Sequence, residues 1–200
     1  MSGVHRTLWP ALRPRLEAEP ARRKAGIPVL VGVDGRSGAG KTDLAGGLAE
    51  AVRGLGRSCE VVHVEELYPG WDGLAEALGP LCAEVVAPLR SGRPGSYVSW
   101  DWDASEPGTR RDVPAAAVVV LEGVGVLASS CAGDLDVRIW LEAPRTVRRV
   151  RALARDGEVF APHWQRWADQ EDALFAGGVP AADVVVDTVS GTARWDRLAP

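Results

Sequence analysis

Short apolar runs and amphipathic segments alternate along this chain. The apolar runs lack the polar–apolar alternation of a half-exposed strand, as is typical of buried parallel strands. The strands predicted from them are residues 28–34, 60–64, 117–121, 137–141 and 183–187. The helices predicted between and after them are residues 42–55, 72–89, 144–156 and 162–175. This order predicts a three-layer α/β fold with a five-stranded, mainly parallel sheet between helices.

Two stretches do not follow this alternation. Residues 1–26 contain Pro10, Pro14 and Pro20, which would break a long helix, so we expect a peripheral arm or short helix there. Residues 27–200 are then expected to form a single domain. Residues 91–114 are rich in Gly, Pro, Ser, Trp and Asp and lack periodicity. We expect a long functional loop there, because long loops in compact domains usually have a function.

Charge and hydropathy narrow the class of protein. The 200 residues carry a formal net charge of −4, whereas proteins that bind nucleic-acid backbones usually carry a basic excess. No apolar run is long enough to cross a membrane, and the N-terminal residues lack the apolar core of a secretory signal. We therefore expect a cytoplasmic protein without a nucleic-acid or membrane partner.

The three cysteines stand singly in the sequence. Cys59, Cys82 and Cys131 form no CxxC pair, which argues against a zinc site and against a disulfide framework. We expect three free thiols in the core of a protein from a reducing compartment.

The glycine-rich segment after the first predicted strand carries the strongest chemical signal. It reads Gly35-Arg-Ser-Gly-Ala-Gly-Lys-Thr42 and fits the pattern GxxxxGK[ST] of a phosphate-binding loop, between a strand and a helix as that motif requires. Glycines let the backbone approach phosphates, and the N–H groups of the loop and the helix N-terminus point at the anion. Lys41 would lie between the β- and γ-phosphates, and the Thr42 hydroxyl would ligate Mg²⁺. The residues expected to bind the nucleotide are Gly35, Ser37, Gly38, Ala39, Gly40, Lys41 and Thr42.

Acidic residues stand at the ends of two other predicted strands. Glu122 ends the most apolar strand and is a candidate to support Mg²⁺ beside the phosphate loop. Glu65 and Glu66 follow the second strand, at the strand ends that face the ligand in this class of fold. Either carboxylate can accept a proton from a substrate hydroxyl, and Glu65 lies nearer the strand end. His63 alternates with core-facing valines, so we expect its side chain to pack in the core or to have its hydrogen bonds satisfied by the protein.

Arginines and tryptophans supply further candidates. The helix after the fourth strand carries several arginines, which clamp phosphate oxygens if they face the crevice and otherwise form a solvated basic face. The chain has eight Trp but only two Phe and two Tyr. Aromatic walls beside carboxylates would suit a ring or sugar that carries hydroxyl groups, with simple packing as the alternative. The candidates of this kind are Trp71, Trp100 and Trp102 with Asp72 and Asp101.

These features together resemble the uridine kinase-like branch of the P-loop kinases, which also contains phosphoribulokinase and pantothenate kinase. The resemblance spans roughly residues 28–190. The run from Glu65 to Tyr68 is similar to one in which the first acid acts as base toward the substrate hydroxyl, with Glu where the family has Asp. Glu122-Gly123 matches a Glu-Gly pair, and residues 100–102 are similar to a Tyr-Asp-Phe run that lines the nucleoside pocket. A histidine that follows this run in uridine kinases is absent, because residues 104–106 read Ala-Ser-Glu.

The resemblance extends to a lid and to the last strand. Arg148-Arg149 and Arg155-Asp156 match the family's Arg-rich lid helix, which implies a catalytic role for Arg148 and nucleotide binding for Arg149. The lid that follows is short, and Gly157 is a candidate hinge. The last predicted strand resembles one whose following loop touches adenine.

The resemblance implies a kinase that uses ATP and Mg²⁺ and transfers the γ-phosphate to a hydroxyl of a nucleoside-like small molecule. Its expected catalytic residues are Lys41, Glu65 and Arg148, and its expected metal-site residues are Thr42 and Glu122. Its expected acceptor pocket contains Glu65, Tyr68, Trp71, Asp72, Trp100, Asp101 and Trp102. Two alternatives stay open: a kinase of another alcohol (pantothenate-like, sugar or antibiotic-type) and a non-catalytic nucleotide-binding regulator.

Overall fold

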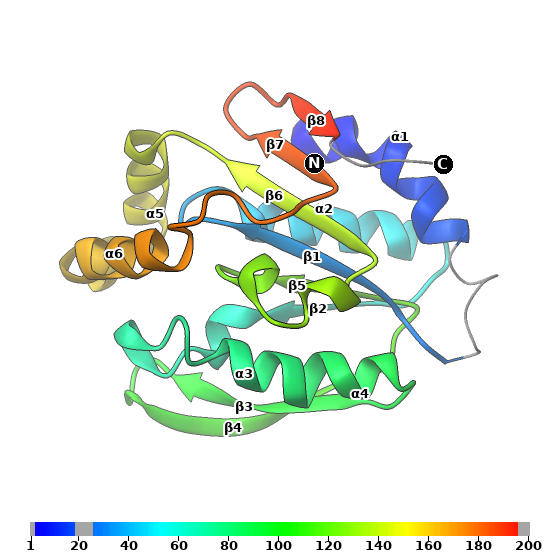
Figure 1. The fold of residues 1–200 in the computed structure, drawn as a ribbon, viewed down its shortest axis with the longest axis horizontal. Coiled ribbons are helices and arrows are strands. Elements are labelled where there is room, and N and C mark those ends of the chain that lie inside the picture. The colour runs from blue at the N-terminus through cyan, green and yellow to red at the C-terminus, as the bar shows by residue number, and fades with distance from the viewer. Residues whose placement is uncertain (1–2, 19–25, 196–200) are drawn as a thin grey trace.

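The computed structural model describes residues 3–18 and 26–195. A six-stranded sheet in the order β2-β5-β1-β6-β7-β8 runs through the middle of the molecule (Figure 1). Its strands are β1 (Val29–Gly35), β2 (Cys59–His63), β5 (Val118–Glu122), β6 (Val137–Glu142), β7 (Val184–Asp187) and β8 (Ala193–Trp195). All pairs are parallel except β7–β8. The predicted mainly parallel sheet is confirmed, and β8 is a sixth, antiparallel strand that was not predicted.

Two neighbouring inner strands, β1 and β5, explain the position of the site. Every residue of β1 and β5 is buried, as expected for strands covered by helices on both faces. Since parallel strands end at the same edge of a sheet, the segments after β1, β2 and β5 lie together there. This edge carries the phosphate loop and the acids predicted to serve it.

Helices α1 (Gly3–Ala18) and α2 (Lys41–Gly54) cover one face of the sheet (Figure 1). The helix α1 continues through Pro10 and Pro14, so the predicted break at these residues is wrong, and Pro20 lies outside the described residues. Both prolines lie on the exposed side, where water can reach the carbonyl groups that they leave unpaired. The opposite side of α1 is fully buried at Leu8, Leu12 and Leu16. These leucines join the core of α2, so this segment is not peripheral.

Short helical segments cover the other face. They are η2 (Val64–Leu67), η3 (Gly70–Asp72), α3 (Leu78–Pro80), the π-helix η4 (Leu81–Val86) and α4 (Ala87–Arg90). The single helix predicted over residues 72–89 is therefore wrong in its first part, where residues 74–77 form turns. Gly73, Gly79 and Pro80 have low helix propensity, which accounts for the interruptions.

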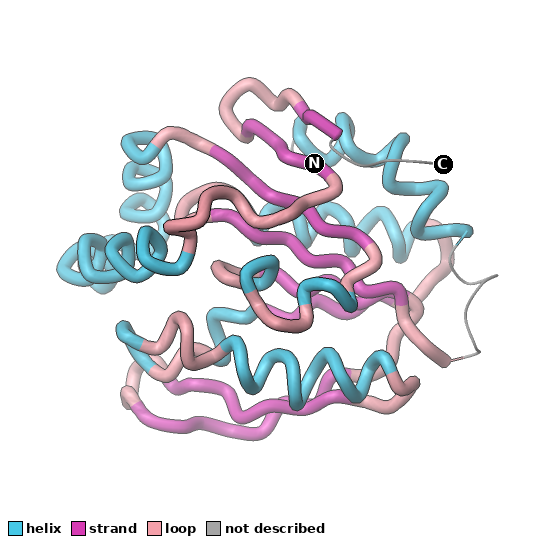
Figure 2. The backbone as a smooth tube through the Cα atoms, in the orientation of Figure 1, coloured by secondary structure: helices cyan, strands magenta, loops and turns pink. Residues whose placement is uncertain are grey.

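Residues 91–114 form a hairpin instead of the predicted loop. Its strands, β3 (Gly95–Asp101) and β4 (Glu106–Val113), pair antiparallel as a separate two-stranded sheet. Figure 2 shows the hairpin beside α3 and α4, away from the central sheet. Seven of the eight residues of β4 are exposed, so no apolar alternation marks this strand in the sequence.

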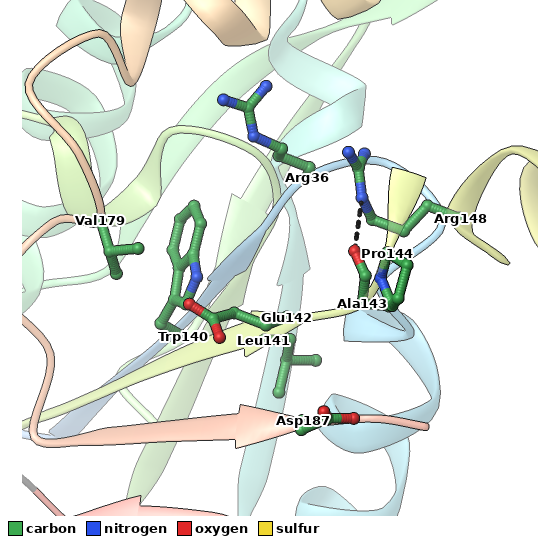
Figure 3. Close-up of a pocket in the computed structure, with 9 residues that line it drawn as sticks. All are labelled: Arg36, Trp140, Leu141, Glu142, Ala143, Pro144, Arg148, Val179 and Asp187. Carbon is green, nitrogen blue, oxygen red and sulfur yellow. Dashed lines mark hydrogen bonds between the residues drawn. The ribbon is translucent and has the colours of Figure 1, made fainter. Parts of the chain in front are cut away.

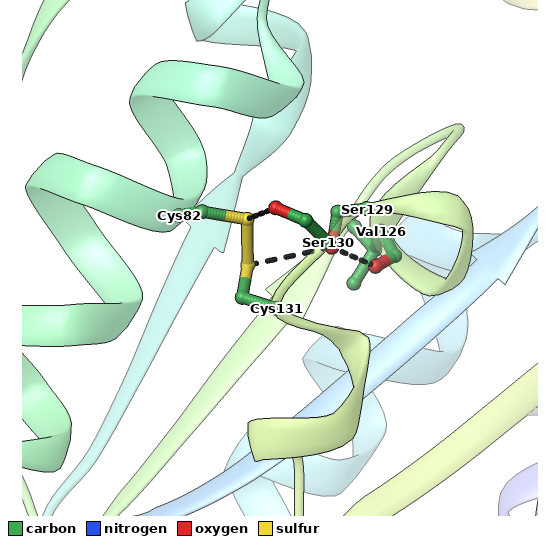
Figure 4. Close-up of a disulfide and its surroundings, with 5 residues drawn as sticks. All are labelled: Cys82, Val126, Ser129, Ser130 and Cys131. Atoms are coloured by element: carbon green, nitrogen blue, oxygen red, sulfur yellow. Dashed lines mark hydrogen bonds between the residues drawn. A yellow bond between two sulfur atoms is a disulfide. The ribbon is translucent and has the colours of Figure 1, made fainter.

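A disulfide joins Cys82 on η4 to Cys131 in the segment after β5 (Figure 4). The two Cα atoms lie 5.5 Å apart although 49 residues separate them in the sequence. The predicted free thiols are therefore wrong for this pair, because only the packing of η4 on the chain after β5 brings the cysteines together. Cys59 is free and buried, as predicted.

Two helices stand at the carboxyl-terminal edge of the sheet. They are α5 (Arg145–Phe160), which is kinked at Gly157, and α6 (Trp164–Leu174). Gly157 has φ +53° and ψ −132°, so the candidate hinge residue interrupts the helix. Among the described residues, no helix is long and apolar enough to span a membrane. The cytoplasmic location and the absence of a nucleic-acid partner stay predictions.

Candidate active site

The phosphate loop connects β1 to α2 and depends on glycine at defined positions. Gly38 and Gly40 have φ values of +78° and +96°, in the left-handed region that glycine adopts without a Cβ clash. A Cβ on Gly38 would lie 2.1 Å from the carbonyl oxygen of Arg148. The backbone therefore requires glycine at positions 38 and 40, and α5 packs directly on the loop.

The loop presents unsatisfied donors to an anion. Gly40 is the N-cap of α2 and provides no side-chain cap, so the first N–H groups of this 14-residue helix are open to an anion. Nothing lies within 4 Å of a Cβ placed on Gly40, which shows open space in front of the helix. The Nζ of Lys41 lies 3.4 Å from the carbonyl oxygen of Arg36 and so spans the loop. This arrangement fits the phosphates of a nucleotide.

Thr42, Glu122 and His63 meet beside the loop. The Thr42 hydroxyl donates to Oε1 of Glu122 over 3.2 Å, and Nδ1 of His63 lies 2.6 Å from the same oxygen. Burial alone would raise the pKa of Glu122, but the hydrogen bond with His63 and the charge of Lys41 outweigh it and hold that pKa below its usual value. The hydroxyl and the anionic carboxylate are oxygen ligands that suit Mg²⁺. The imidazole of His63 has a hydrogen-bond partner, as expected, but Glu122 was not foreseen as that partner.

Asp34 is a buried acid that the sequence reasoning missed. It is fully buried at the end of β1, where its carboxylate accepts backbone N–H groups from Gly35, Gly125 and Leu127. Burial raises its pKa to about 6, although these three hydrogen bonds act in the opposite direction. The contacts tie the start of the phosphate loop to the segment after β5. A polar residue at the end of an otherwise apolar strand was the available signal.

The two adjacent glutamates after β2 differ in their surroundings. Glu66 accepts a hydrogen bond from the Tyr97 hydroxyl over 2.8 Å and lies 3.8 Å from Nε of Arg111. Glu65 is exposed, and no described residue hydrogen-bonds or ion-pairs with its carboxylate. Glu66 is thus held by the hairpin, whereas Glu65 is available to a substrate.

Aromatic side chains gather around Trp71 on η3. The ring of Trp71 stacks on His163 and on Phe160, with centroids 4.3 and 5.4 Å apart. Trp102 lies 4.8 Å from Trp71, and its indole Nε1 donates to the Glu65 carbonyl oxygen. This cluster joins η3 and the hairpin to the end of α5, and its rings pack on one another. A role of these rings as the wall of an acceptor pocket stays a prediction. Tyr68 is buried, and its hydroxyl donates to the Val124 carbonyl oxygen.

Three predicted acceptor residues make other contacts. Asp72 pairs with Arg166 on α6, at an exposed position. Asp101 accepts two backbone N–H groups in the hairpin turn, from residues 103 and 104. Trp100 packs close to Gly70 and lines an apolar cavity of about 220 Å³ under the hairpin.

The two lid arginines have different environments. Arg149 is exposed, and its predicted role in nucleotide binding stays a prediction. Arg148 is buried, and its guanidinium donates to the carbonyl oxygens of Ser37 and Ala143. Burial lowers the pKa of Arg148, and neighbouring Glu171 counteracts this. Arg148 therefore supports the loop from outside the anion-binding face.

A cavity of about 410 Å³ opens beside the loop at the ends of β6 and β7 (Figure 3). Arg36 and Arg148 border it on one side and Asp187 on the opposite side. Its wall includes Trp140, whose indole Nε1 is buried without a hydrogen-bond partner among the described residues. The cavity thus combines an aromatic wall and carboxylates next to the phosphate loop.

No protein-family model and no curated protein matches this sequence. Solved structures match its fold. A possible uridine kinase from Bacillus stearothermophilus is 19% identical, with a TM-score of 0.55, over 88% of this chain and 98% of that one. A protein proposed to be a fructose transport system kinase, from Silicibacter sp. TM1040, is 19% identical, with a TM-score of 0.61. The match covers 92% of this chain and 98% of that one.

D-glycerate 3-kinase from Cryptococcus neoformans var. grubii is 13% identical, with a TM-score of 0.66, over 98% of this chain and 99% of that one. These neighbours belong to the uridine kinase-like group of P-loop kinases. At 13–19% identity the likeness concerns architecture, and this chain has the fold of that group.

Proposed function

We propose that this chain is a kinase that uses ATP and Mg²⁺ to phosphorylate a hydroxyl group of a nucleoside-like small molecule. One observation carries the proposal: the anion-binding loop, the Thr42–Glu122 pair and the unengaged carboxylate of Glu65 lie at one edge of the sheet. The neighbours named as kinases support phosphoryl transfer as the reaction.

The nucleotide would be held by the loop and by the open N-terminus of α2. Lys41 would bind the β- and γ-phosphates, and Thr42 and Glu122 would hold Mg²⁺, which neutralises charge on the phosphates. Arg149, which is exposed on α5, would approach the phosphates. The cavity at the ends of β6 and β7 would take the base, since Asp187 there precedes the loop that the family resemblance assigns to adenine.

Glu65 would accept the proton of the attacking hydroxyl. Its carboxylate is exposed at the end of β2, next to the strand that ends in Glu122. General base catalysis by a positioned carboxylate contributes about 10²–10⁴-fold. The neighbouring aromatic cluster around Trp71 would exclude water on the acceptor side and present flat surfaces to a ring or sugar.

The first test is ADP release by the purified protein with Mg·ATP, alone and with uridine, cytidine, adenosine or guanosine. We expect release that depends on one of these acceptors, and mass spectrometry should show the phosphorylated nucleoside. The Lys41→Ala variant should lose about 100- to 1,000-fold in turnover because a charge-stabilising donor at the transferring phosphoryl group is removed. Unchanged turnover in that variant would contradict the proposal.

A matched pair of variants separates the two glutamates. Glu65→Gln should lower kcat about 100-fold or more, with little change in the KM for ATP, because the base is lost. Glu66→Gln keeps an acceptor for the Tyr97 hydroxyl and should change kcat less than about threefold. A larger loss for Glu66→Gln than for Glu65→Gln would assign the base to Glu66.

A second acceptor class has support among the neighbours. One of them is named a D-glycerate 3-kinase, and another is proposed to act in fructose transport. Sugars, sugar acids and pantothenate should therefore follow the nucleosides in the same assay. Tight binding of Mg·ATP without release in the presence of any acceptor would instead identify a nucleotide-binding regulator.

A further inference from the structure

A carboxylate from α6 reaches the phosphate loop. Glu171 is 1% exposed, and its Oε1 accepts the backbone N–H of Ser37 over 2.7 Å. The two residues are separated by 134 positions in the sequence, and nothing in the local pattern of α6 indicates this contact. Glu171 is thus one of the few described side chains that bond directly to the backbone of the loop.

Arg148 completes the contact from α5. Its Nη1 donates to the carbonyl oxygen of Ser37 over 3.2 Å and lies 3.6 Å from Oε2 of Glu171. The N–H and the C=O of Ser37 are therefore both held, one by a carboxylate and the other by a guanidinium. The backbone of Arg148 also lies where a Cβ on Gly38 would be, so this wall contacts the loop along two successive residues.

Electrostatics explain why a buried carboxylate is tolerated so near a phosphate site. An unpaired buried anion would be costly and would repel the phosphates. Here Arg148 and Arg36 both lie within 4 Å of Oε2 of Glu171. Arg36 is also paired with Asp172, the next residue of α6. The charge is therefore compensated on the outer side of the loop, and the inner side keeps its open N–H groups for the anion.

We propose that Glu171 is a positioning residue for nucleotide binding, which acts by fixing the Ser37 peptide and the guanidinium of Arg148. This inference rests on the proposed function for its turnover readout, but its main readout is nucleotide affinity. A residue between Gly35 and Gly38 has little local constraint, because glycine backbones are permissive. Holding Ser37 from outside keeps the loop in the conformation that binds phosphates and lowers the entropy lost on binding.

The test compares three variants of the full chain. In Glu171→Ala both the acceptor for Ser37 and the charge beside Arg148 are lost. In Glu171→Gln the side-chain carbonyl oxygen can still accept the Ser37 N–H. Asp169→Asn changes an exposed carboxylate on the same helix, whose described hydrogen bond is with Gln165, and serves as the control. Isothermal titration calorimetry with Mg·ATP measures Kd without any acceptor, and circular dichroism reports whether each variant is folded.

We expect Kd for Mg·ATP to rise about 10- to 100-fold in Glu171→Ala, with recovery to within about fivefold in Glu171→Gln and no change in Asp169→Asn. In turnover assays the KM for ATP should rise, and the KM for the acceptor should not. A merely structural role would lower the melting temperature and the active fraction but would leave Kd of the folded molecules unchanged. Folded Glu171→Ala with a wild-type Kd would overturn the proposal, as would Glu171→Gln as weak as Glu171→Ala.

Failure of the proposed function is distinguishable from failure of this inference. If the wild-type chain binds Mg·ATP but phosphorylates no acceptor, the kinase assignment fails and the affinity series still decides the role of Glu171. If Glu171→Ala does not fold, the affinity of Glu171→Gln against Asp169→Asn decides it. The proposal then requires a loss of about two- to fivefold, because Gln keeps the acceptor for Ser37 but not the charge beside Arg148. An unchanged Kd or a larger loss overturns it.

Discussion

The proposed nucleotide side and the proposed acceptor side of the site are built from different kinds of contact. On the nucleotide side, backbone and charged groups are fixed by directional hydrogen bonds, such as those on Ser37 and Glu122. On the acceptor side, Trp71 is surrounded by aromatic rings at centroid distances from 4.3 to 6.3 Å. Directional bonds fix individual atoms, whereas ring packing allows side chains to shift with modest cost. Under the proposed function, the nucleotide side would hold one invariant ligand, and the shape of the acceptor side would set specificity.

The largest expected effect on stability and on affinity for Mg·ATP comes from a substitution of Gly38, on the nucleotide side. A Cβ there would meet the Arg148 carbonyl oxygen at 2.1 Å, and φ is +78°. Gly38→Ala should lower the free energy of unfolding by about 3 kcal/mol or more, because strain and overpacking add. Affinity for Mg·ATP should fall about 100-fold, which calorimetry measures.

Gly46→Ala on α2 is the matched control for this prediction. A Cβ at Gly46 meets nothing within 4 Å, and the residue has helical geometry. The same substitution should here stabilise the chain by up to about 1 kcal/mol, with unchanged affinity. If Gly38→Ala and Gly46→Ala had the same free energy of unfolding and the same affinity for Mg·ATP, the loop would tolerate displacement of α5.

The next effect concerns the disulfide, which joins η4 to the segment after β5. Changing Cys82 and Cys131 together to Ser should lower the free energy of unfolding by about 2–4 kcal/mol, because the unfolded chain gains freedom. Affinity for Mg·ATP should stay within about twofold of the wild type. Urea unfolding with and without dithiothreitol measures the free energy of unfolding, and calorimetry measures the affinity for Mg·ATP.

Cys59→Ala supplies the control for the disulfide. Since Cys59 is a free thiol, dithiothreitol should destabilise this variant as much as the wild type and should leave the double Ser variant unaffected. A reductant effect that disappears in Cys59→Ala would show that the pairing differs from the one described.

A pH dependence is expected from Asp34, on the nucleotide side. Its pKa of about 6 lies above the usual 3.8, so the folded state binds this proton more tightly than the unfolded state. The contribution of Asp34 to stability is therefore full below about pH 4 and is lost as pH rises through about 6, by up to about 3 kcal/mol. The unfolding free energy of the wild type minus that of Asp34→Asn should fall over this range in urea titrations. A constant difference between pH 4 and 7 would contradict the assignment.

The difference between local patterns and long-range contacts explains which features the sequence predicts. The five parallel strands and the loop from Gly35 to Thr42 are each contiguous, so local patterns identify them. The hairpin strand β4 is exposed at nearly every residue and offers no apolar signal. Glu171 on Ser37 and Cys82 on Cys131 are separated by 134 and 49 residues, and such contacts depend on how elements pack. For Asp72 and Asp101 the residue type alone does not decide the role, because acids near aromatic residues also form ion pairs and turns, as these two do here.

The smallest expected effect comes from removing the hydrogen bond between Tyr97 and Glu66, which tests how the acceptor side is held. The Tyr97 hydroxyl donates to Glu66 over 2.8 Å, and burial with this carboxylate raises the pKa of Tyr97. Tyr97→Phe removes one hydrogen bond to a half-buried carboxylate and should lower the unfolding free energy by about 1 kcal/mol. If Glu65 alone is the base, kcat should change less than about threefold, because the hairpin contact only supports η2. A tenfold or greater loss of kcat, with folding intact by circular dichroism, would mean that the hairpin positions the base and that the acceptor side is as directional as the nucleotide side.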